Sequence, residues 1–433
     1  MKKLILCAAL MAILSSTALA QSGTNSPYSQ YGLGILSDNG TGFSRSMNGL
    51  GLGFHEHNQV NTLNPASYAS IDSLSFIFDA GFSGQVTNFQ ENGVKKNANN
   101  ADFDYVVAGF HLANHLGVSF GVLPYTNIGY SYSSTGKLNV SSSPTTFTNT
   151  YNGTGGLHQI YLGAGWEPIK ELSFGFNVGY LWGNYERSVI NSYSNAYINT
   201  LSKYYTATVN NYKLDLGMQY TAKINRNDNI TLGLVYGLGH KLSANPKCQI
   251  ISTNSSTGVS DTTAISISNG LEIPSTYGAG LMYNHANKLK LGVDYTLMKY
   301  TGIGYPMSTL SSDGKQSYEM VNGIYKNRQK LTVGATFCPN ENGRHFMDHV
   351  RYNIGASYAT PYYKINGQDG PKEYGVSAGF GIPIINGWNN RSYLNISGSW
   401  TRQEAVGLIK ENTFRINIGF TFNERWFAKW KVQ

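Results

Sequence analysis

The residues best placed for chemistry are His55-Glu56-His57, since two imidazoles one residue apart point the same way in an extended segment. No third ligand is identifiable beside them, so the pattern favours a plain surface over a metal site. The sequence shows no Gly-x-Ser-x-Gly elbow, phosphate-binding loop or zinc-protease helix. Gly237-Leu238-Gly239 lies in an alternating segment and is not a dinucleotide fingerprint. We therefore expect no cofactor, no bound metal and no enzyme activity such as that of a lipase or protease.

The first twenty residues have the three parts of a secretory signal peptide. Lys2 and Lys3 precede an apolar run over 4–14, and the small-residue triplet Ala18-Leu19-Ala20 follows. The alternative is a membrane anchor, but the apolar run is too short to span a bilayer. We expect residues 1–20 to be removed and the rest to be exported.

Composition narrows the class of the exported protein, which keeps 413 residues. Only Cys248 and Cys338 remain, which permits one bridge but no disulfide scaffold. Charged residues make up 13 %, and no run of Lys or Arg forms a nucleic-acid patch. Gly (49) and Tyr (31) are abundant, and no later stretch is apolar enough for a membrane helix. A soluble secreted β-protein and an outer-membrane β-barrel both fit.

Alternation of apolar and polar residues favours the barrel. It is clear at 212–222, 289–297 and 414–423, in segments of about ten residues, the length of a tilted membrane-crossing strand. Strands of soluble sandwiches are typically shorter, about five or six residues, and no blade-like repeat supports a propeller. Aromatic residues often end the apolar set, as interfacial girdles require: Trp166, Tyr180, Trp182, Tyr283, Tyr295 and Trp400.

The segments predict an all-β fold, a transmembrane antiparallel barrel of about fourteen strands. Polar turns at 225–229 and 284–287 would be periplasmic, whereas 136–156, 243–274 and 301–327 read as extracellular loops. The expected strands begin near residues 74, 103, 116, 157, 172, 205, 229, 275, 288, 328, 348, 372, 392 and 412.

Residues 21–73 do not alternate and are rich in Gly and Asn. About eight strands already make a barrel that side chains just fill, so a wider one needs a plug or leaves a pore. We predict that 21–73 form a hatch in the lumen, with a loose periplasmic leader as the alternative. The barrel would occupy 74–423 and a tail 424–433. Inside it, Lys213, Asp215, Asp294 and Arg415 fall on the lumenal set and would form polar networks.

Several motifs, taken in order, are similar to one family. They are Ser-Pro-Tyr-Ser-Gln-Tyr-Gly at 26–32, an Arg-containing Gly-rich segment at 45–53, Asn64-Pro65-Ala66, Pro-Ser-Thr-Tyr-Gly at 274–278, Leu-Gly-Val-Asp-Tyr at 291–295 and a last strand ending at Phe422. This order resembles the FadL-type outer-membrane transporters of hydrophobic compounds, most of all their Bacteroidota relatives. The resemblance implies a fourteen-stranded barrel, an N-terminal hatch, a lumenal ligand pocket and a lateral exit at a kinked third strand.

The third expected strand contains Pro124, and proline cannot donate a ladder hydrogen bond, so a local break in the wall is expected there. A harmless bulge is the alternative. Two departures from the family stand out: Ser67-Tyr68 follow the Asn-Pro-Ala turn, and the chain continues past Phe422 as a tail.

Two functions follow from the resemblance, both for a multi-pass outer-membrane protein that contacts outer-membrane lipid and no nucleic acid. The first is passive uptake of a hydrophobic or amphipathic ligand such as a fatty acid. The residues expected to gate it are Arg45, Gly49, Asn64, Pro65, Ala66 and Pro124. The second is an accessory or structural subunit of a larger secretion or assembly complex, with outer-membrane protein partners, because the fold alone does not fix the function.

Overall fold

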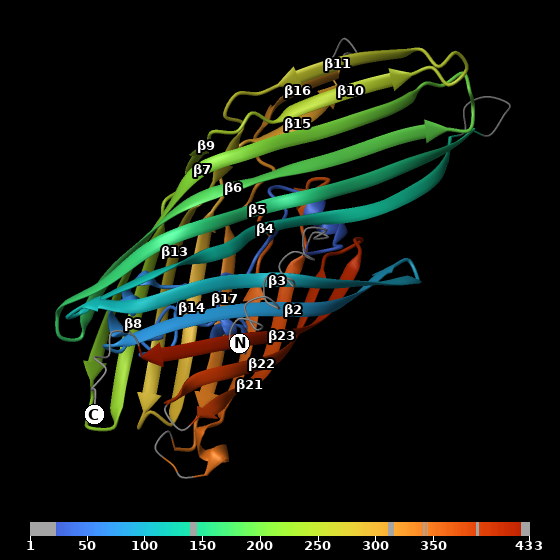
Figure 1. Cartoon of the computed structure of the whole chain (residues 1–433). Helices are drawn as coiled ribbons and strands as arrows, with labels where there is room; N and C mark the ends of the chain where they lie inside the picture. The colour runs from blue at the N-terminus through green and yellow to red at the C-terminus, as the bar shows by residue number, and fades with distance from the viewer. Residues whose placement is uncertain are drawn as a thin grey trace, which may run out of the picture.

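The computed structural model describes residues 23–138, 145–310, 316–340, 343, 345–386 and 389–425. Fourteen antiparallel strands form a closed ring, since β23 returns to pair with β2, with Phe422 opposite Phe78 (Figure 1). The fourteen strands are β2 (Ser75–Glu91), β3 (Val94–Ala113), β4 (Leu116–Leu138), β5 (Thr145–Ile169), β6 (Leu172–Tyr193), β7 (Thr200–Lys223), β8 (Asp228–Gly237), β13 (Ser275–His285), β14 (Leu289–Lys299), β17 (Arg328–Phe337), β18 (Arg351–Ala359), β21 (Lys372–Asn386), β22 (Asn389–Glu404) and β23 (Lys410–Arg425). The predicted fold class is confirmed.

The outer face of the ring carries an apolar band. On β6, Phe174, Phe176, Val178 and Tyr180 are exposed, while Ser173 and others of the alternate set are buried in the lumen. Three of the expected girdle residues, Trp166, Tyr180 and Tyr295, are among the exposed aromatics. This is the pattern of a barrel that faces lipid outside and polar groups inside. No helix in the described part of the chain is long and apolar enough to cross a membrane.

One side of the ring rises far above the band. β4 to β7 are 22 to 25 residues long, and β10 (Lys247–Thr253) and β11 (Ser260–Ser266) extend their sheet beyond β7. On β6, ten residues from Asn184 to Tyr193 lie past the band, which is about 30 Å of strand. We call this projection, residues 127–138, 145–156, 184–193 and 200–210 with β10 and β11, the crest (Figure 1).

The prediction of three extracellular loops is therefore wrong in part. Residues 136–156 belong mostly to β4 and β5, 243–274 contain β10, β11 and β12 (Leu271–Ile273), and 301–327 contain β15 (Tyr305–Leu310) and β16 (Gln316–Val321). The crest is polar on its outer face, so its strands lack the apolar alternation that predicts a membrane strand. For the same reason β5 and β7 begin before the expected residues 157 and 205, and β3 begins before residue 103 because its first residues, 94–102, are also mostly polar. The other short elements are β9 (His240–Leu242), β19 (Lys364–Ile365), β20 (Gln368–Asp369) and η4 (Phe346–His349).

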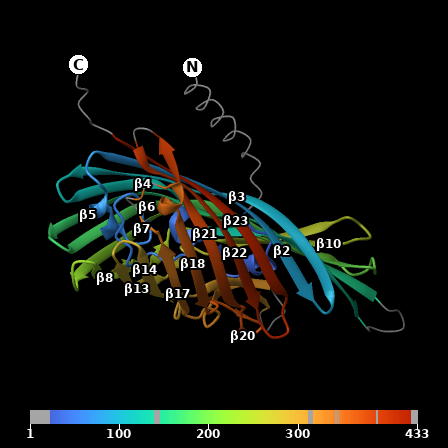
Figure 2. The same cartoon turned by 90° about the horizontal axis from the view of Figure 1, so that it is seen from below.

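The N-terminal segment lies inside the ring, as the view from below shows (Figure 2). Its elements are η2 (Pro27–Gln30), β1 (Ile35–Leu36), α2 (Gly42–Arg45) and η3 (Pro65–Ser70). We name residues 23–37 the strap and residues 42–71 the hatch. The hatch touches strands on opposite sides of the ring: Tyr68 lies against Gly117, and Met47 against Gly355.

Candidate functional site: a charged chamber beside a parted wall

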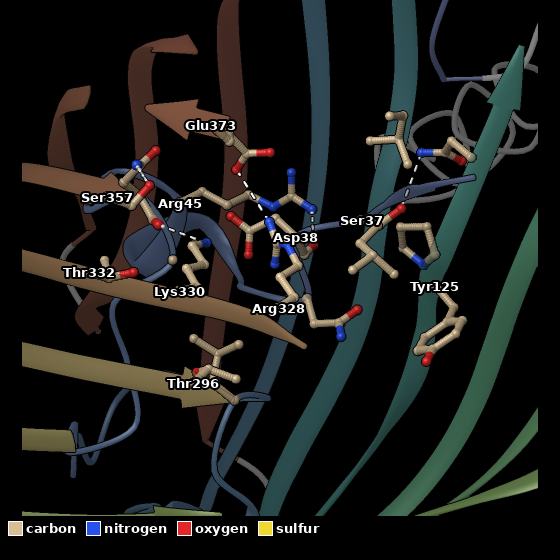
Figure 3. Close-up of a pocket in the computed structure, with 18 of the residues that line it drawn as sticks. Ser37, Asp38, Arg45, Tyr125, Thr296, Arg328, Lys330, Thr332, Ser357 and Glu373 are labelled. Atoms are coloured by element: carbon tan, nitrogen blue, oxygen red, sulfur yellow. Dashed lines mark hydrogen bonds and ion pairs between the residues drawn. The ribbon is translucent and has the colours of Figure 1, made fainter. Parts of the chain in front are cut away.

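A chamber of 340 Å³ lies in the lumen, between the strap, the hatch and the surrounding strands. Figure 3 looks into it, with Asp38 and Arg45 near its centre and Arg328, Lys330 and Glu373 reaching in from the wall. Seven carboxyl groups and five basic groups line it: Asp38, Asp102, Asp104, Asp215, Asp294, Glu373 and Glu411, with Arg45, Lys213, Arg328, Lys330 and Arg415. The chamber is therefore suited to water and charged groups more than to a hydrocarbon.

Arg45 ties the hatch to the wall at one side of the chamber. Its guanidinium lies 3.0 Å from the carboxylate of Asp104 on β3, and the two side chains are only 4 % and 5 % exposed. It also donates hydrogen bonds to the carbonyls of Gly40 (2.7 Å) and Asp38 (2.8 Å) and lies over the ring of Tyr105. The guanidinium of Arg45 thus holds the backbone turn before α2 through Nε and Nη2 and binds the wall through Nη1.

Asp38 marks the junction between strap and hatch. Burial alone would raise its pKa, but the nearby cations Lys330 and Arg45 hold the pKa of this carboxyl below its ordinary value. Its Oδ1 also accepts the backbone N–H of Gly40 at 3.0 Å. Gly49, at φ +87°, turns the hatch backbone beside Asp38 and Lys330, where a side chain would be strained. Asp38 therefore remains an anion that the chamber's cations neutralise.

The lumenal residues expected from alternation do form polar networks. Asp294 accepts the backbone N–H groups of Gly51 (2.7 Å) and Leu52 (2.8 Å) of the hatch. Lys213 pairs with Asp215, and the guanidinium of Arg415 donates to Gln85 at 2.9 Å.

Inward-facing glycines seat the hatch. A Cβ on Gly175 of β6 would overlap the backbone of Pro65, and one on Gly233 of β8 would overlap the carbonyl of Leu52. The same close approach to hatch backbone occurs at five wall glycines, Gly117, Gly165, Gly175, Gly233 and Gly355. We call these five residues the glycine belt. At the belt, hatch backbone lies directly on wall backbone, because glycine has no side chain to separate them.

The wall parts between β3 and β4. These strands pair from Ala113 opposite Leu116 up to Val106 opposite Val122, and above that level neither is paired with the other. Pro124 lies at this point, beside a register shift in the pairing of β4 with β5 between Pro124 and Thr126. We call the two stretches that do not pair with each other, 94–105 of β3 and 123–138 of β4, the seam.

The strap fills the lower part of the seam. β1 pairs with β4 through Ile35 opposite Asn127, and toward β3 the side chain of Asn25 donates to the carbonyl of Asn99 at 3.3 Å. The hydroxyl of Ser29 meets both the N–H (3.1 Å) and the carbonyl (3.2 Å) of Gly129 on β4. The strap thus bridges two strand edges by polar contacts.

A cluster of tyrosines holds the strap on the side of the long loops. Tyr28 of the strap packs with Tyr300, Tyr325, Tyr362 and Tyr363, which follow β14 and β18. This cluster joins the strap to two loops of the ring.

The six residues predicted to gate the lumen divide into two groups. Arg45, Gly49, Pro65 and Pro124 line the chamber. Asn64 and Ala66 lie in the hatch beneath, where Asn64 caps η3 and donates to the carbonyls of Leu52 (2.9 Å) and Met218 (3.2 Å). Sequence reasoning missed Asp38, Lys330 and Glu373, and it missed the belt, although the glycines were visible as the inward set of the alternation.

The histidine pair serves separate contacts. His55 bonds Gln219 at 2.9 Å, His57 bonds Asp72 at 2.9 Å, and Glu56 pairs with Lys290 of the wall. Across the described residues, no cluster of three metal-binding side chains occurs. Cys248 and Cys338 are both buried as free thiols.

Comparison with known proteins gives one family and one fold. A family model described as BamG matches residues 1–433. Among curated proteins, none matches the chain significantly. The Pseudomonas putida toluene transporter TodX is similar in structure, with a TM-score of 0.61, 13 % identity and coverage of 91 % of this chain and 100 % of that one.

Two further solved structures agree. The Ralstonia pickettii toluene transporter TbuX gives a TM-score of 0.60 at 12 % identity over 90 % of this chain and 99 % of its own. A Pseudomonas aeruginosa FadL homologue gives 0.56 at 12 % identity over 90 % and 98 %. Identities this low establish the fold alone, and that fold is the FadL type that the sequence motifs predict.

Proposed function

The chain belongs to the BamG family, and we propose that it acts in the outer membrane as an accessory subunit of a larger secretion or assembly complex. The fold is shared with transporters, so the role has to be argued from the lumen and the surface.

The lumen is the observation that carries this proposal. A pocket for a hydrophobic ligand is lined mainly by apolar side chains with few polar groups. Here a lumenal chamber of 340 Å³ is lined by twelve ionisable groups. Below it the hatch meets the wall backbone to backbone at the glycine belt. Such a lumen favours a barrel that is closed and used as a scaffold.

The crest gives the scaffold a surface. It adds about 30 Å of sheet on one side of the ring, and its outer face is polar: Asn184, Glu186 and Ser188 continue the face that carries Tyr180 below. Neither lipid contact nor the chamber requires this projection. A tall one-sided sheet outside the membrane is well placed to contact other envelope proteins.

Uptake of hydrophobic compounds is the second candidate, and the seam favours it. Pro124 lies where the wall parts, and an apolar hollow of 700 Å³ on the outer face, lined by Phe120, Ile160 and Val178 among others, adjoins the same strands. In this scheme Arg45, Gly49, Asn64, Pro65 and Ala66 would hold the hatch shut, and the strap would move away from Pro124 to open a lateral path.

Isolation from native membranes in a mild detergent tests the first candidate. We expect the chain in a particle well above the mass of one processed chain with its detergent micelle, with other envelope proteins at fixed stoichiometry through two orthogonal purification steps. Recovery of this chain alone would contradict it.

A tether separates the two candidates. Gly23→Cys with Asp102→Cys joins the strap to β3, since an added Cβ on Gly23 would lie 2.8 Å from the Cγ of Asp102, with each single variant as control. If the barrel is a scaffold, the oxidised tether leaves the complex and growth unchanged. If it is a conduit, oxidation abolishes hydrocarbon uptake and reduction restores it.

A further inference from the structure

We propose that the free edge of β4 in the crest, residues Ser131–Lys137, receives an extended segment of a different protein, which adds to β4 as an antiparallel strand. This inference rests on the proposed role as a complex subunit and names the surface and the mode of contact.

The edge is a regular strand with one side unused. β4 pairs with β5 along its whole upper part, up to Leu138 opposite Thr145. On the other side, pairing with β3 ends at Val122 and pairing with β1 ends at Asn127. No strand in the described part of the chain occupies that side beyond these points.

The backbone groups that face the seam can be identified. The carbonyl of Tyr125 accepts the N–H of Ser37 at 3.0 Å, and both backbone groups of Gly129 meet the Ser29 hydroxyl. Orientation alternates along a strand, so the next residues to present N–H and C=O to the seam are Ser131, Ser133, Thr135 and Lys137.

The strap itself cannot extend up this edge. Gly34 has φ +101°, and a Cβ there would come within 2.6 Å of the carbonyl oxygen of Asn127. The backbone turns away at this glycine, and Ser29 supplies a hydroxyl where a strand would supply backbone. β1 therefore shows that this side of β4 accepts an antiparallel strand, and the turn at Gly34 leaves the upper edge free.

Natural proteins protect exposed edges with proline, charge or very short strands, because a free edge templates strand addition. Ser131–Lys137 contains no proline and a single charge, Lys137, and its outward side chains Ser131, Ser133 and Thr135 are exposed. Strand addition uses the main chain for affinity and side chains for selectivity. The fitting partner segment is polar, rich in Ser, Thr or Asn, with an acidic residue near Lys137.

A second copy of this chain does not meet these requirements. Two barrels upright in one membrane have their β4 strands running in the same direction, so identical edges would meet in parallel. Both pairings on this side of β4, with β3 and with β1, are antiparallel. The free edge of β3 in a second copy would run antiparallel to β4, but it would bring Lys95 and Lys96 toward Lys137, and like charges on paired strands repel. We therefore assign the added strand to a different polypeptide.

Backbone hydrogen exchange compares the complex from native membranes with the purified single chain. We expect at least tenfold slower exchange in the complex for the amides of Ser131, Ser133, Thr135 and Lys137, with no change for the β5-bonded amides of Tyr132 and Ser134. Equal exchange in complex and single chain would overturn the inference while leaving the subunit role intact. Failure to recover any complex would overturn both.

A proline variant removes one hydrogen-bond donor from the free edge of β4 and leaves the backbone groups that pair with β5 unchanged. Ser133→Pro deletes one seam-facing N–H, and the matched control Ser133→Ala keeps it. We expect the proline variant to lose at least tenfold of the partner from the purified particle, with normal barrel folding by heat-modified gel mobility, and the alanine variant to retain it. Full retention by a folded Ser133→Pro barrel, or protection contributed by lipid or a second copy in the exchange experiment, would overturn the inference.

Discussion

The hatch and the strap are consecutive parts of one segment, yet the barrel holds them by opposite means. The hatch is fixed by backbone contact with the glycine belt and by a buried ion pair between Arg45 and Asp104. The strap is fixed by hydroxyl and amide contacts with strand edges, such as those of Ser29 and Asn25. Close packing resists motion more than exchangeable polar contacts do. We therefore expect the strap to loosen while the hatch stays in place.

Breaking the ion pair of the hatch should have the largest effect. Arg45→Ala leaves Asp104 buried without its cation, at a cost of about 3–5 kcal/mol, read as a lower unfolding temperature in detergent. The matched control is Arg402→Ala, which breaks a partly exposed pair with Glu404 and should cost about 1 kcal/mol or less. Equal losses in the two variants would mean that Arg45 does not anchor the hatch.

Filling the belt should come next. Gly175→Ala forces a methyl into the backbone of Pro65 and should cost about 1–3 kcal/mol by overpacking. Gly398→Ala is the control, since nothing lies within 4 Å of its added Cβ. Both variants are compared by urea unfolding of the folded barrel. A neutral Gly175→Ala would contradict a tightly seated hatch.

Removing one contact of the strap should have a smaller, local effect. Ser29→Ala deletes the hydroxyl that meets Gly129 and should cost about 1 kcal/mol. Amide exchange at Gly129 should accelerate while that of the hatch residue Leu52 stays unchanged. Ser256→Ala, at an exposed loop hydroxyl, controls for the loss of any serine. Faster exchange throughout the hatch would show that the two parts move together.

Asp38 at the junction gives the smallest expected effect. Its folded pKa is below the ordinary 3.8, so its stabilising contribution is complete above pH 3.8 and is lost as pH falls through the folded value. Asp38→Asn should therefore flatten the loss of stability below about pH 4, measured by thermal unfolding from pH 6 to 2.5. An unchanged acid profile would assign that loss to other carboxyls.

The membrane-spanning part of the fold could be predicted from the sequence. Outward apolar alternation on β6, β14 and β23 reflects contact with lipid, which acts along every membrane strand alike, so strands could be placed from it. The crest lies beyond the apolar band, and the Asn and Ser residues on its outer face show no outward apolar alternation. Strand extension there depends on pairing with neighbours, which local sequence does not record.

The site is less predictable for a related reason. Pro124 predicts a break in strand pairing from the sequence alone, because proline has no backbone N–H to donate to a neighbouring strand. Asp38 and Lys330 meet only after the ring closes, 292 positions apart in the chain, and nothing local marks either. Gly175 and Gly217 were visible as inward glycines, but their partner Pro65 emerges only from the packed lumen.

The glycine belt also constrains the order in which the molecule is built. The segment that it grips is synthesised before any wall strand, and the ring shuts only when β23, the last strand, reaches β2. Because hatch backbone lies on wall backbone at opposite sides of the ring, inserting the hatch into a finished ring would require the wall to open. We therefore expect the hatch to be in place before β23 pairs with β2, so that the barrel closes around the N-terminal segment.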